Sequence, residues 1–403
     1  MITVQISPHL RKGTLMMEST VIARVDAVTL EGKRPRAAGS NARLGYHGDV
    51  VRLPLVRLTT TDGITGWGRS SVDPALLETV PGKSLGDLIS GSTVQPAWAA
   101  LELPLLDLAA RIAGQPVHRF VSGADPLPVR SYDTSLYFDD LHLDSDDEAV
   151  ALIADEARQG WDRGHRAFKI KVGRGAMHMP LNEGMARDIA IIHGVREAVG
   201  PDATIMIDAN NGWNLNLTKQ VLTETASANL YWIEEVFHED NVLYGHLKEW
   251  QAAEGLNVLI ADGEGVPDPR VPGWAREGVI DVVQTNIYQR GFGNWHTFGR
   301  ELDGLGVQSS PHTYGSGIGN YVTSQLAATL QGLNYVEWDE ATFDAIDNSA
   351  FAIVEGVVTM PETPGLGLEL DDDAFNAAVA ASGATYGRSR PGGSHRPVSS
   401  REA

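Results

Sequence analysis

The 403-residue chain contains no cysteine, so it forms no disulfide, thiolate zinc site or iron–sulfur cluster and has no cysteine nucleophile. Basic residues are also scarce. There are 32 Lys plus Arg against 52 Asp plus Glu, a net charge of −20, which argues against nucleic acid and anionic membranes as partners. No apolar run approaches the roughly 18 residues of a membrane-spanning helix, and the N-terminus has no signal-type apolar block. We therefore expect a soluble cytoplasmic protein.

What the chain does contain is ordinary for a globular protein with a large core. Hydrophobic residues make up 42% of the chain and charged residues 21%. The length allows two or three domains, or one large barrel with an appendage.

The first 127 residues have the pattern of a small α+β domain. Extended, β-branched stretches predict strands, and Asp62-Gly63 is typical of a hairpin turn. Apolar residues at helical spacing predict a helix that ends at Gly114. Residues 31–49, rich in Gly, Pro, Ser and basic side chains, are expected to form a long exposed loop. The predicted strands span 20–30, 50–60 and 64–68, and the helix spans 101–112.

From residue 128 the pattern changes to short apolar runs that alternate with amphipathic helices. This alternation indicates parallel βαβ units, and eight strands is the number that closes a barrel. An open doubly wound sheet is the alternative, but no G-x-G-x-x-G follows the first run to support it. The eight runs are 129–138, 167–172, 204–208, 230–235, 257–262, 281–286, 307–311 and 335–339.

We therefore divide the chain into four parts. Residues 1–127 form the N-terminal domain and 128–345 form the barrel. Residues 346–381 have strand character and are expected to return to the first domain. Residues 382–403, rich in Gly, Ser, Pro and Arg, are expected to be a flexible tail.

Acidic residues follow three consecutive strands of the predicted barrel. Asp208, Glu234 and Glu264 lie one βα unit apart, at the carboxyl ends where barrel enzymes carry their active sites. Because neighbouring strands are about 4.8 Å apart, the three carboxylates can converge on one ion. Hard oxygen ligands favour Mg²⁺, with Mn²⁺ as the second candidate. Asp262, two residues before Glu264, competes with it as the third ligand.

Two lysines on the second barrel strand, Lys169 and Lys171, are two residues apart and point to the same face. Their apolar neighbours point the other way, so both ammonium groups are expected inside the barrel. A lysine acts as a base only when neutral, against a reference pKa of about 10.4. Burial, the second lysine and a divalent cation all favour the neutral form. Structural ion pairs and a Schiff-base lysine are the alternatives.

The seventh and eighth strands end in further titratable groups. His312 follows the seventh strand, opposite the lysine strand across the barrel, and is a candidate second acid or base. The eighth strand ends with Glu337 and Asp339. The two-residue period favours Glu337 as the acid that faces the barrel mouth.

Taken in order, these motifs resemble the enolase superfamily, in its mandelate racemase-like branch. The stretch A-L-E-L-P-L-L-D-L-A-A-R-I-A-G-Q-P-V resembles the capping-domain helix of that branch, and P-G-L-G-L-E-L resembles its C-terminal segment. The resemblance runs from about residue 20 to 375. It implies an α+β capping domain on a modified (β/α)7β TIM-type barrel. The motifs are K-I-K, I-D-A-N, W-I-E-E and G-E on strands two to five, then the strand-seven His and the strand-eight Glu.

The resemblance also implies roles for these residues. The three acids would be the Mg²⁺ ligands, Lys171 the base with Lys169 as its charge partner, and His312 the opposite-face acid or base. Glu337 would hydrogen-bond the substrate carboxylate or enediolate, and Asn210 would be the polar residue beside the metal. The family's usual multimers imply a homo-oligomer.

One position departs from the family pattern. Asn286 stands on strand six where the family has Asp. An amide can orient an imidazole but cannot stabilise an imidazolium as an anion does. This change weakens His312 as a strong base while leaving it a general acid.

The chemistry that follows is proton abstraction beside a carboxylate, with the enediolate stabilised by Mg²⁺. Loss of a β-hydroxyl then gives a 2-keto-3-deoxy acid, so we expect a sugar-acid dehydratase, a carbon–oxygen lyase of carbohydrate-acid catabolism. Asn286 weakens the alternative of a two-base racemase or epimerase of a 2-hydroxy acid. A catalytically silent ligand-binding barrel and a Schiff-base aldolase are further alternatives.

The basic side chains Arg34, Arg36 and Arg43 belong to the predicted loop 31–49. By analogy with the family, this loop would lie over the barrel mouth. We expect these arginines, together with Asn286 and Asn210, to contact a small carboxylate substrate, most simply a sugar acid. Solvated surface charge is the alternative for the arginines.

Overall fold

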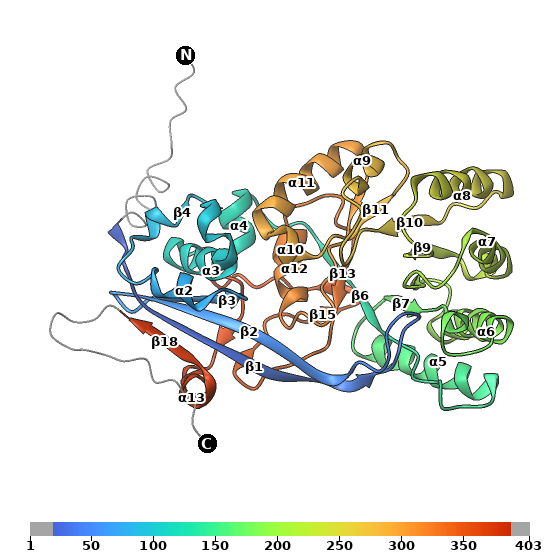
Figure 1. Ribbon diagram of the computed structural model, residues 1–403, viewed down its shortest axis with the longest axis horizontal. Coiled ribbons are helices and arrows are strands. Elements are labelled where there is room, and N and C mark those ends of the chain that lie inside the picture. Colours follow the sequence, from blue (N-terminus) through green and yellow to red (C-terminus); the bar gives the residue numbers. More distant parts are fainter. Residues whose placement is uncertain (1–18, 388–403) are drawn as a thin grey trace, which may run out of the picture.

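The structure is a computed structural model that describes residues 19–387 (Figure 1). A four-stranded antiparallel sheet with the order β18-β1-β2-β3 lies at one end of the molecule. Helix α3 (Glu102–Ala113) packs on β3 and ends at Gly114 in the left-handed conformation, as predicted. The sheet strands are β1 (Ile22–Ala38), β2 (Gly48–Thr60), β3 (Thr65–Arg69) and β18 (Ala384–Gly387).

The expectation of a long loop over residues 31–49 is wrong, because β1 and β2 extend as a hairpin and leave only 39–47 as its tip. Strand alternation continues past Leu30, but its buried positions are taken by Gly32 and Arg34 instead of apolar residues. Gly32 allows close approach to the chain after the last barrel strand, where Lys33 N–H donates to the Thr342 carbonyl at 2.9 Å. The hairpin therefore reaches from the small sheet to the barrel (Figure 1).

Eight parallel strands form the barrel, each within a predicted run. Their order is β12-β11-β10-β9-β8-β7-β6, and β13 pairs with β6 on its other side. Within the described residues no ladder joins β12 to β13; Ser309 N–H instead donates to the Gly332 carbonyl at 3.0 Å. The strands are β6 (Val129–Leu136), β7 (Ala167–Lys171), β8 (Thr204–Asp208), β9 (Leu230–Glu234), β10 (Leu259–Asp262), β11 (Val282–Val283), β12 (Gln308–Ser309) and β13 (Val336–Trp338).

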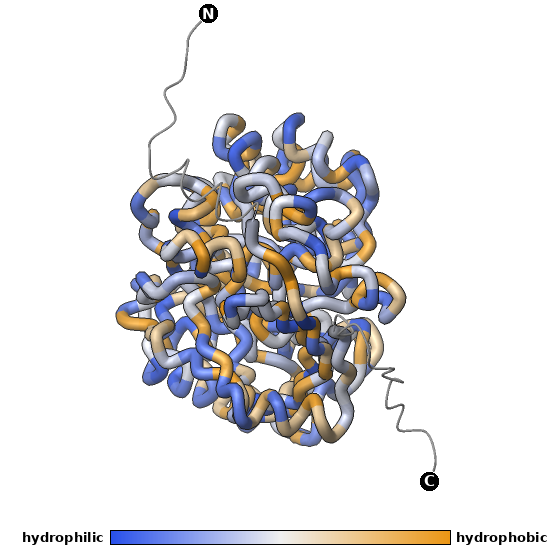
Figure 2. Tube along the Cα trace, turned by 90° about the vertical axis from the view of Figure 1, so that its left-hand side faces the viewer, coloured by the Kyte–Doolittle hydropathy of each residue, from blue (hydrophilic) through white to orange (hydrophobic). Residues whose placement is uncertain are grey.

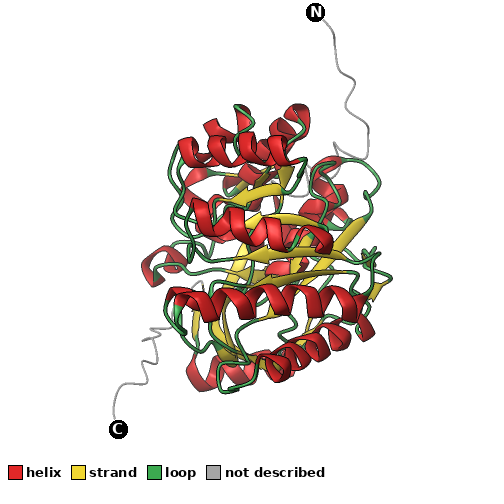
Figure 3. Ribbon diagram, turned by 90° about the vertical axis from the view of Figure 1, so that its right-hand side faces the viewer, coloured by secondary structure: helices red, strands yellow, loops and turns green. Residues whose placement is uncertain are grey.

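Helices cover the outside of these strands (Figure 3). Each strand from β6 to β12 is followed by a helix, whereas β13 leads into an extended segment. This is the (β/α)7β pattern. The helices are α5 (Asp146–Asp162), α6 (Leu181–Val199), α7 (Leu215–Glu224), α8 (Asn241–Glu254), α9 (Val271–Arg276), α10 (Ile287–Arg290), α11 (Phe292–Leu305) and α12 (Gly319–Ala327).

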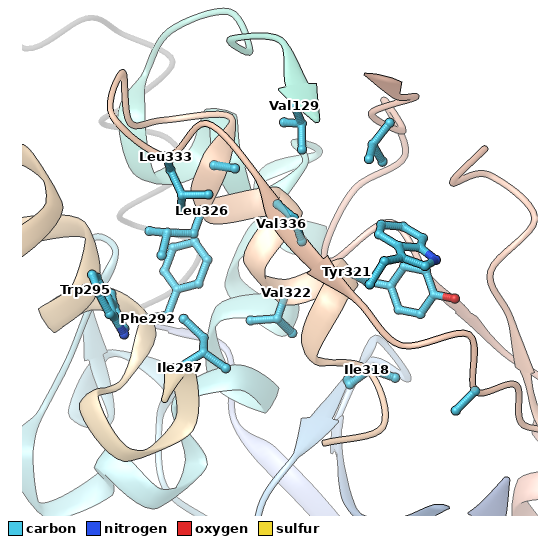
Figure 4. Close-up of a cluster of buried hydrophobic side chains, with 14 of the residues drawn as sticks. Val129, Ile287, Phe292, Trp295, Ile318, Tyr321, Val322, Leu326, Leu333 and Val336 are labelled. Atoms are coloured by element: carbon cyan, nitrogen blue, oxygen red, sulfur yellow. The ribbon is translucent and has the colours of Figure 1, made fainter. Parts of the chain in front are cut away.

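Apolar side chains fill both sides of the barrel wall. Seen from the side of the small sheet, hydrophobic and hydrophilic stretches are interspersed along the chain (Figure 2). Outside the strands, α10, α11 and α12 share one cluster in which Ile287 and Phe292 lie near Val322 and Leu326 (Figure 4). Inside the barrel, a separate layer of apolar side chains fills the space between the strands. In this layer the Tyr132 and Trp232 rings meet edge-on, with their centroids 5.4 Å apart. This layer is made by Tyr132, Ala167, Met206, Trp232, Ala261 and Val282.

The C-terminal segment returns to the small sheet. It contains the short strands β14 (Ile346–Asp347), β15 (Ile353–Val354), β16 (Val357–Val358) and β17 (Glu369–Leu370), then α13 (Asp372–Ser382). Residues 384–387, which the composition places in a flexible tail, form β18 instead, because they pair with the open edge of β1 from Arg24 to Ala27. The rest of the predicted tail lies outside the described residues. No described helix is long and apolar enough to span a membrane.

Asp107 joins the small sheet and helix α3 to the returning C-terminal segment. Its buried carboxylate accepts from Trp67 N on β3 at 2.9 Å, from Leu366 N in the returning segment at 2.7 Å and from Arg111 Nε at 2.8 Å. An amide in its place would turn a donor toward at least one of these N–H groups.

We expect Asp107→Asn to lower the free energy of unfolding by about 3 kcal/mol, because buried donors lose their acceptor. Urea denaturation followed by circular dichroism measures the change. The control is Asp125→Asn, since the side chain of Asp125 is 95% exposed and its loss should leave the unfolding curve unchanged. Equal curves for both variants would contradict the role of Asp107.

Candidate active site

A cavity of about 690 Å³ lies between the hairpin and the carboxyl ends of the barrel strands. The hairpin contributes one wall and the barrel mouth the other. The lining residues include Arg34, Asn41, His47, Tyr137, Lys171, Asn210, Glu264, His312 and Tyr314. The cavity thus brings capping-domain and barrel side chains to one place, which is typical of ligand sites at domain boundaries.

Three carboxylates converge at this mouth, as the sequence predicts. Asp208 ends β8, Glu234 ends β9 opposite it, and Glu264 follows β10. One oxygen of each lies within 4.8 Å of the others. Burial and the two neighbouring carboxylates raise the pKa of Glu234 to about 8, although Lys169 lowers it. Such crowding of acids, with the buried Glu264 Oε2 left without a hydrogen-bond partner, fits a hard divalent cation.

Asp262 does not take part in this group. Its buried carboxylate accepts from the Tyr244 hydroxyl and from Gly263 N, and burial raises its pKa to about 8. The chain turns at Gly263, where φ is +110°, so Asp262 and Glu264 no longer share one strand face. Glu264, and not Asp262, therefore lies with Asp208 and Glu234, and its role as the third metal ligand stays a prediction.

The two lysines both lie inside the barrel but have different surroundings. Lys169 is 1% exposed, and its Nζ is 2.8 Å from Glu234 Oε1, 3.1 Å from Glu337 Oε1 and 3.6 Å from Asp208 Oδ2. Lys171 lines the cavity, and its ammonium contacts Asp208. Burial alone would lower the pKa of Lys171, but Asp208, together with Glu264 and Glu234, raises it. The charge of Lys171 therefore depends on what else the Asp208 carboxylate binds.

His312 lies in the cavity wall between an amide and two acids. Its Nε2 is 3.5 Å from Glu264 Oε2 and 3.9 Å from Glu337 Oε2, and its Nδ1 is 3.2 Å from Asn286 Nδ2. The Asn286 Oδ1 accepts from Tyr288 N and Gln289 N at the start of α10. The amide nitrogen must then donate to His312 Nδ1, which places the imidazole proton on Nε2, toward the cavity.

Glu337 is a buried anchor and does not line the cavity. It accepts from Thr134 Oγ1 at 2.9 Å, Thr313 N at 2.7 Å and Tyr314 N at 2.9 Å. Although burial opposes ionisation, Lys169 holds the pKa of Glu337 well below its usual range. With its oxygens engaged in this way, Glu337 positions Lys169 and the chain after His312, and its direct contact with a substrate stays a prediction.

Of the three predicted loop arginines, the structure brings Arg34 to the cavity. Arg34 forms a two-bonded ion pair with Asp339, at 2.7 and 2.8 Å, and stacks over the Tyr314 ring. Arg36 lies outside the cavity lining because it is held by Asp139 and by Glu156 at 2.8 Å. Arg43 is exposed at the hairpin tip and does not line the cavity either.

Several lining residues escaped the sequence analysis. The Tyr137 and Tyr314 rings stack at 5.1 Å, and His47 meets Tyr137 edge-on at 5.0 Å. Tyr137 follows β6 and Tyr314 follows His312, so inspection of every strand end could have found both. His47 carries no such signal, since the hairpin tip was expected to be loop. Together with Arg34, these rings form a polar-aromatic part of the cavity wall, with the Tyr137 ring centroid 5.3 Å from Lys171 Nζ.

Asn210 lines the cavity beside the triad, as predicted, and its backbone is left-handed with φ +42°. Its Nδ2 donates to Glu235 Oε2 at 3.1 Å, and its buried Oδ1 has no hydrogen-bond partner. Burial and the nearby acids Glu264, Asp208 and Asp262 raise the pKa of Glu235 to about 9. Glu235, which sequence analysis did not single out, is buried and hydrogen-bonded to Asn210 behind the triad.

The family model described as enolase C-terminal domain-like matches residues 152–374, more than half of the chain. The chain belongs to the enolase superfamily, in the mandelate racemase and muconate lactonizing enzyme branch. Both the predicted family and the predicted fold, a TIM-type barrel with a capping domain, are confirmed.

Similar solved structures include galacturonate dehydratase from Geobacillus sp. in complex with D-galacturonate and 5-keto-4-deoxy-D-galacturonate. It is 45% identical, with a TM-score of 0.88 over 92% of this chain and 100% of that one. A mutant of galacturonate dehydratase from Geobacillus sp. complexed with Mg is 44% identical, with a TM-score of 0.89 over 92% and 98%. D-galactarolactone cycloisomerase from Agrobacterium fabrum is 25% identical over 366 residues, covering 80% of this chain and 89% of that protein.

We expect Glu264→Gln to weaken binding of a divalent cation by more than about tenfold, because removal of a ligand should exceed the loss of an outer-shell partner. Isothermal titration with Mg²⁺ measures the affinity. Asp262→Asn is the matched control on the same strand end and should bind the cation with nearly wild-type affinity. The reverse pattern would make Asp262 the third ligand.

Proposed function

We propose that the protein is a Mg²⁺-dependent sugar-acid dehydratase that acts on a uronate such as D-galacturonate. The observation that carries this proposal is the pairing of each proton-transfer candidate with an acid of the triad. Lys171 contacts Asp208, and His312 lies 3.5 Å from Glu264. A substrate carboxylate held at the triad would thus have an amine on one side and an imidazole N–H on the other.

The named ligands of the Geobacillus enzyme support the substrate class. D-galacturonate and 5-keto-4-deoxy-D-galacturonate differ by one water. Counted from the carboxylate, C5 is the α-carbon and C4 carries the β-hydroxyl. The 5-keto-4-deoxy compound therefore has its ketone on the α-carbon and its deoxy position on the β-carbon, as a 2-keto-3-deoxy acid does. At 45% identity over nearly the whole chain, we extend this chemistry to the present protein.

Asp208, Glu234 and Glu264 would hold Mg²⁺, which supplies electrostatic stabilisation of the enediolate when bound. Lys171, in its neutral form, takes the α-proton onto Nζ. Lys169 remains the buried charge partner, fixed by Glu234 and Glu337. The His312 Nε2–H donates a hydrogen bond to the β-hydroxyl, which takes up a proton from solvent and departs as water. The enol that remains tautomerises to the ketone.

Asn286 favours elimination over racemisation. Racemisation needs a second base on the opposite face of the α-carbon from Lys171. If His312 is that base, it becomes an imidazolium when it carries the proton. The Asn286 amide presents a donor to His312 Nδ1, which opposes protonation at that atom. Curated relatives include epimerases as well as dehydratases, so epimerisation is the alternative that the experiments must separate.

The primary test is proton NMR in D₂O with Mg²⁺ and D-galacturonate, alongside a panel of other mono- and diacid sugars. Wild type should generate a keto-deoxy product that carries deuterium at the deoxy carbon, where tautomerisation adds a hydrogen from solvent. Lys171→Ala should lower kcat by at least about 10²-fold, because general-base catalysis is typically worth that much. Product formation at the wild-type rate in this variant would remove Lys171 as the base.

His312→Asn separates the two halves of the reaction. It should lose the keto-deoxy product while still exchanging the α-proton for deuterium, since Lys171 is intact. An epimerised substrate in place of a keto-deoxy product in wild type would move the assignment to an epimerase. Binding of sugar acids without exchange or product in wild type would support a silent barrel.

We expect Asn286→Asp to make His312 a competent second base. The variant should return substrate that is deuterated and inverted at the α-carbon, a product absent from wild type. Gln289→Glu is the control, because it adds the same charge on α10, where Gln289 is exposed and does not contact His312. Identical product mixtures from wild type and Asn286→Asp would show that the amide does not decide the outcome.

A further inference from the structure

A second cavity of about 860 Å³ lies where the capping domain meets α10 and α11. It shares no lining residue with the active-site cavity. Arg69 and Ser92 line it from the capping side, and Asn286, Arg290 and His296 from the barrel side. Cavities at domain interfaces are common ligand sites, and this one is lined by two arginines in a chain whose net charge is strongly negative.

Arg69 ends β3 with its guanidinium stacked on the Tyr288 ring, 4.2 Å from the ring centroid. Its Nε is buried and has no hydrogen-bond partner. Within residues 19–387, no carboxylate forms an ion pair with it. Stacking fixes the plane of the guanidinium and leaves its N–H edge free for in-plane bonds.

Arg290 has the same arrangement on the opposite wall. Its guanidinium lies 3.8 Å from the centroid of Phe298, and its buried Nε is also without a partner. The nearby acid Glu301 is engaged by Arg276 at 2.5 Å, and no described carboxylate pairs with Arg290. His296 also lines this cavity, and its buried Nε2 lacks a hydrogen-bond partner.

Glu102 is the one acid among the lining residues, and its oxygens are already engaged. They accept from Phe292 N at 2.7 Å and from Gly293 N at 2.9 Å, at the start of α11. The glutamate thus caps the helix and forms no ion pair with either lining arginine in the described part of the chain. Beneath the cavity, Ile287, Phe292 and Trp295 anchor α10 and α11 in the core (Figure 4).

Buried N–H donors without acceptors are costly, and two planar guanidinium edges match the geometry of a carboxylate or phosphate. The walls are held in place by aromatic stacking and core packing, so the donors are fixed before a ligand arrives. We propose that this cavity is a second binding site, separate from the active site, for a small oxyanion that carries a carboxylate or phosphate group and is held by Arg69 and Arg290.

The test is isothermal titration of the Mg²⁺-loaded full-length protein with inorganic phosphate and, separately, with succinate. These two arms distinguish a phosphate from a carboxylate ligand. At least one anion should bind to wild type. Arg69→Gln and Arg290→Gln should each weaken that binding by about tenfold or more, the usual scale for loss of a charge-assisted hydrogen bond.

Two control variants locate the anion. Arg300→Gln removes an exposed arginine of α11 that does not line the cavity, and Arg34→Gln removes the arginine of the active-site cavity. Both should bind like wild type. Arg69→Lys keeps the positive charge but lacks the planar guanidinium, so it should bind the anion less tightly than wild type. This variant keeps the test valid if Arg69→Gln does not fold. No binding of either anion, or binding lost in Arg34→Gln and kept in Arg69→Gln, would overturn the proposal.

Discussion

The buried ammonium of Lys169 is the interaction on which the rest of the active site depends. Four carboxylates, Asp208, Glu234, Glu264 and Glu337, gather at one end of the barrel, and three of them lie within ion-pair distance of Lys169. Like charges buried so closely would otherwise repel and take up protons. With all four acids ionised, Lys169 and Lys171 leave two negative charges uncompensated. That remainder is the charge that a divalent cation neutralises.

This arrangement explains the division of labour between the lysines. Lys169 is held from several sides and fills the space above the Tyr132 ring, 5.3 Å from its centroid. Lys171, one strand pleat higher, shares Asp208 and faces the cavity. The register of the parallel strands places Lys171 opposite Asp208 and Asp208 opposite Glu234. These two strand pairings therefore set the positions of Lys171 and of two acids of the triad together.

Much of this could be predicted from the sequence. Barrel strands appear in it as short apolar runs, and the polar residue that ends or follows each run lies at the mouth of the barrel. Asp208, Glu234, Lys171 and His312 were found in this way. The strand pattern could not distinguish Asp262 from Glu264. Their positions depend on the turn at Gly263 and on a hydrogen bond that the Tyr244 hydroxyl donates to Asp262.

The cavity wall was harder to predict. Arg34 occupies a buried strand position that an apolar residue usually fills, and its partner Asp339 lies 305 residues away. His47 reaches the site only because the hairpin crosses from one domain to the other. Glu337 was correctly placed at the barrel end, but its saturation by backbone N–H groups is a property of the folded loop after His312. Such contacts depend on tertiary geometry that local patterns do not encode.

The hairpin has a consequence for how this enzyme can change over generations. Residues that recognise the far end of a substrate would come from a tip of nine residues, 39–47, whereas Lys171, Asp208 and Glu234 stand on barrel strands, and Glu264 and His312 follow barrel strands. The tip contacts the barrel through the Ser40 carbonyl, which accepts from Phe138 N at 2.9 Å, and the Asn41 carbonyl, which lies 2.8 Å from His178 Nε2. Mutations in the tip can therefore change which substrates bind while the residues that carry out the reaction stay the same. New substrates can be acquired in this way before any catalytic group is replaced.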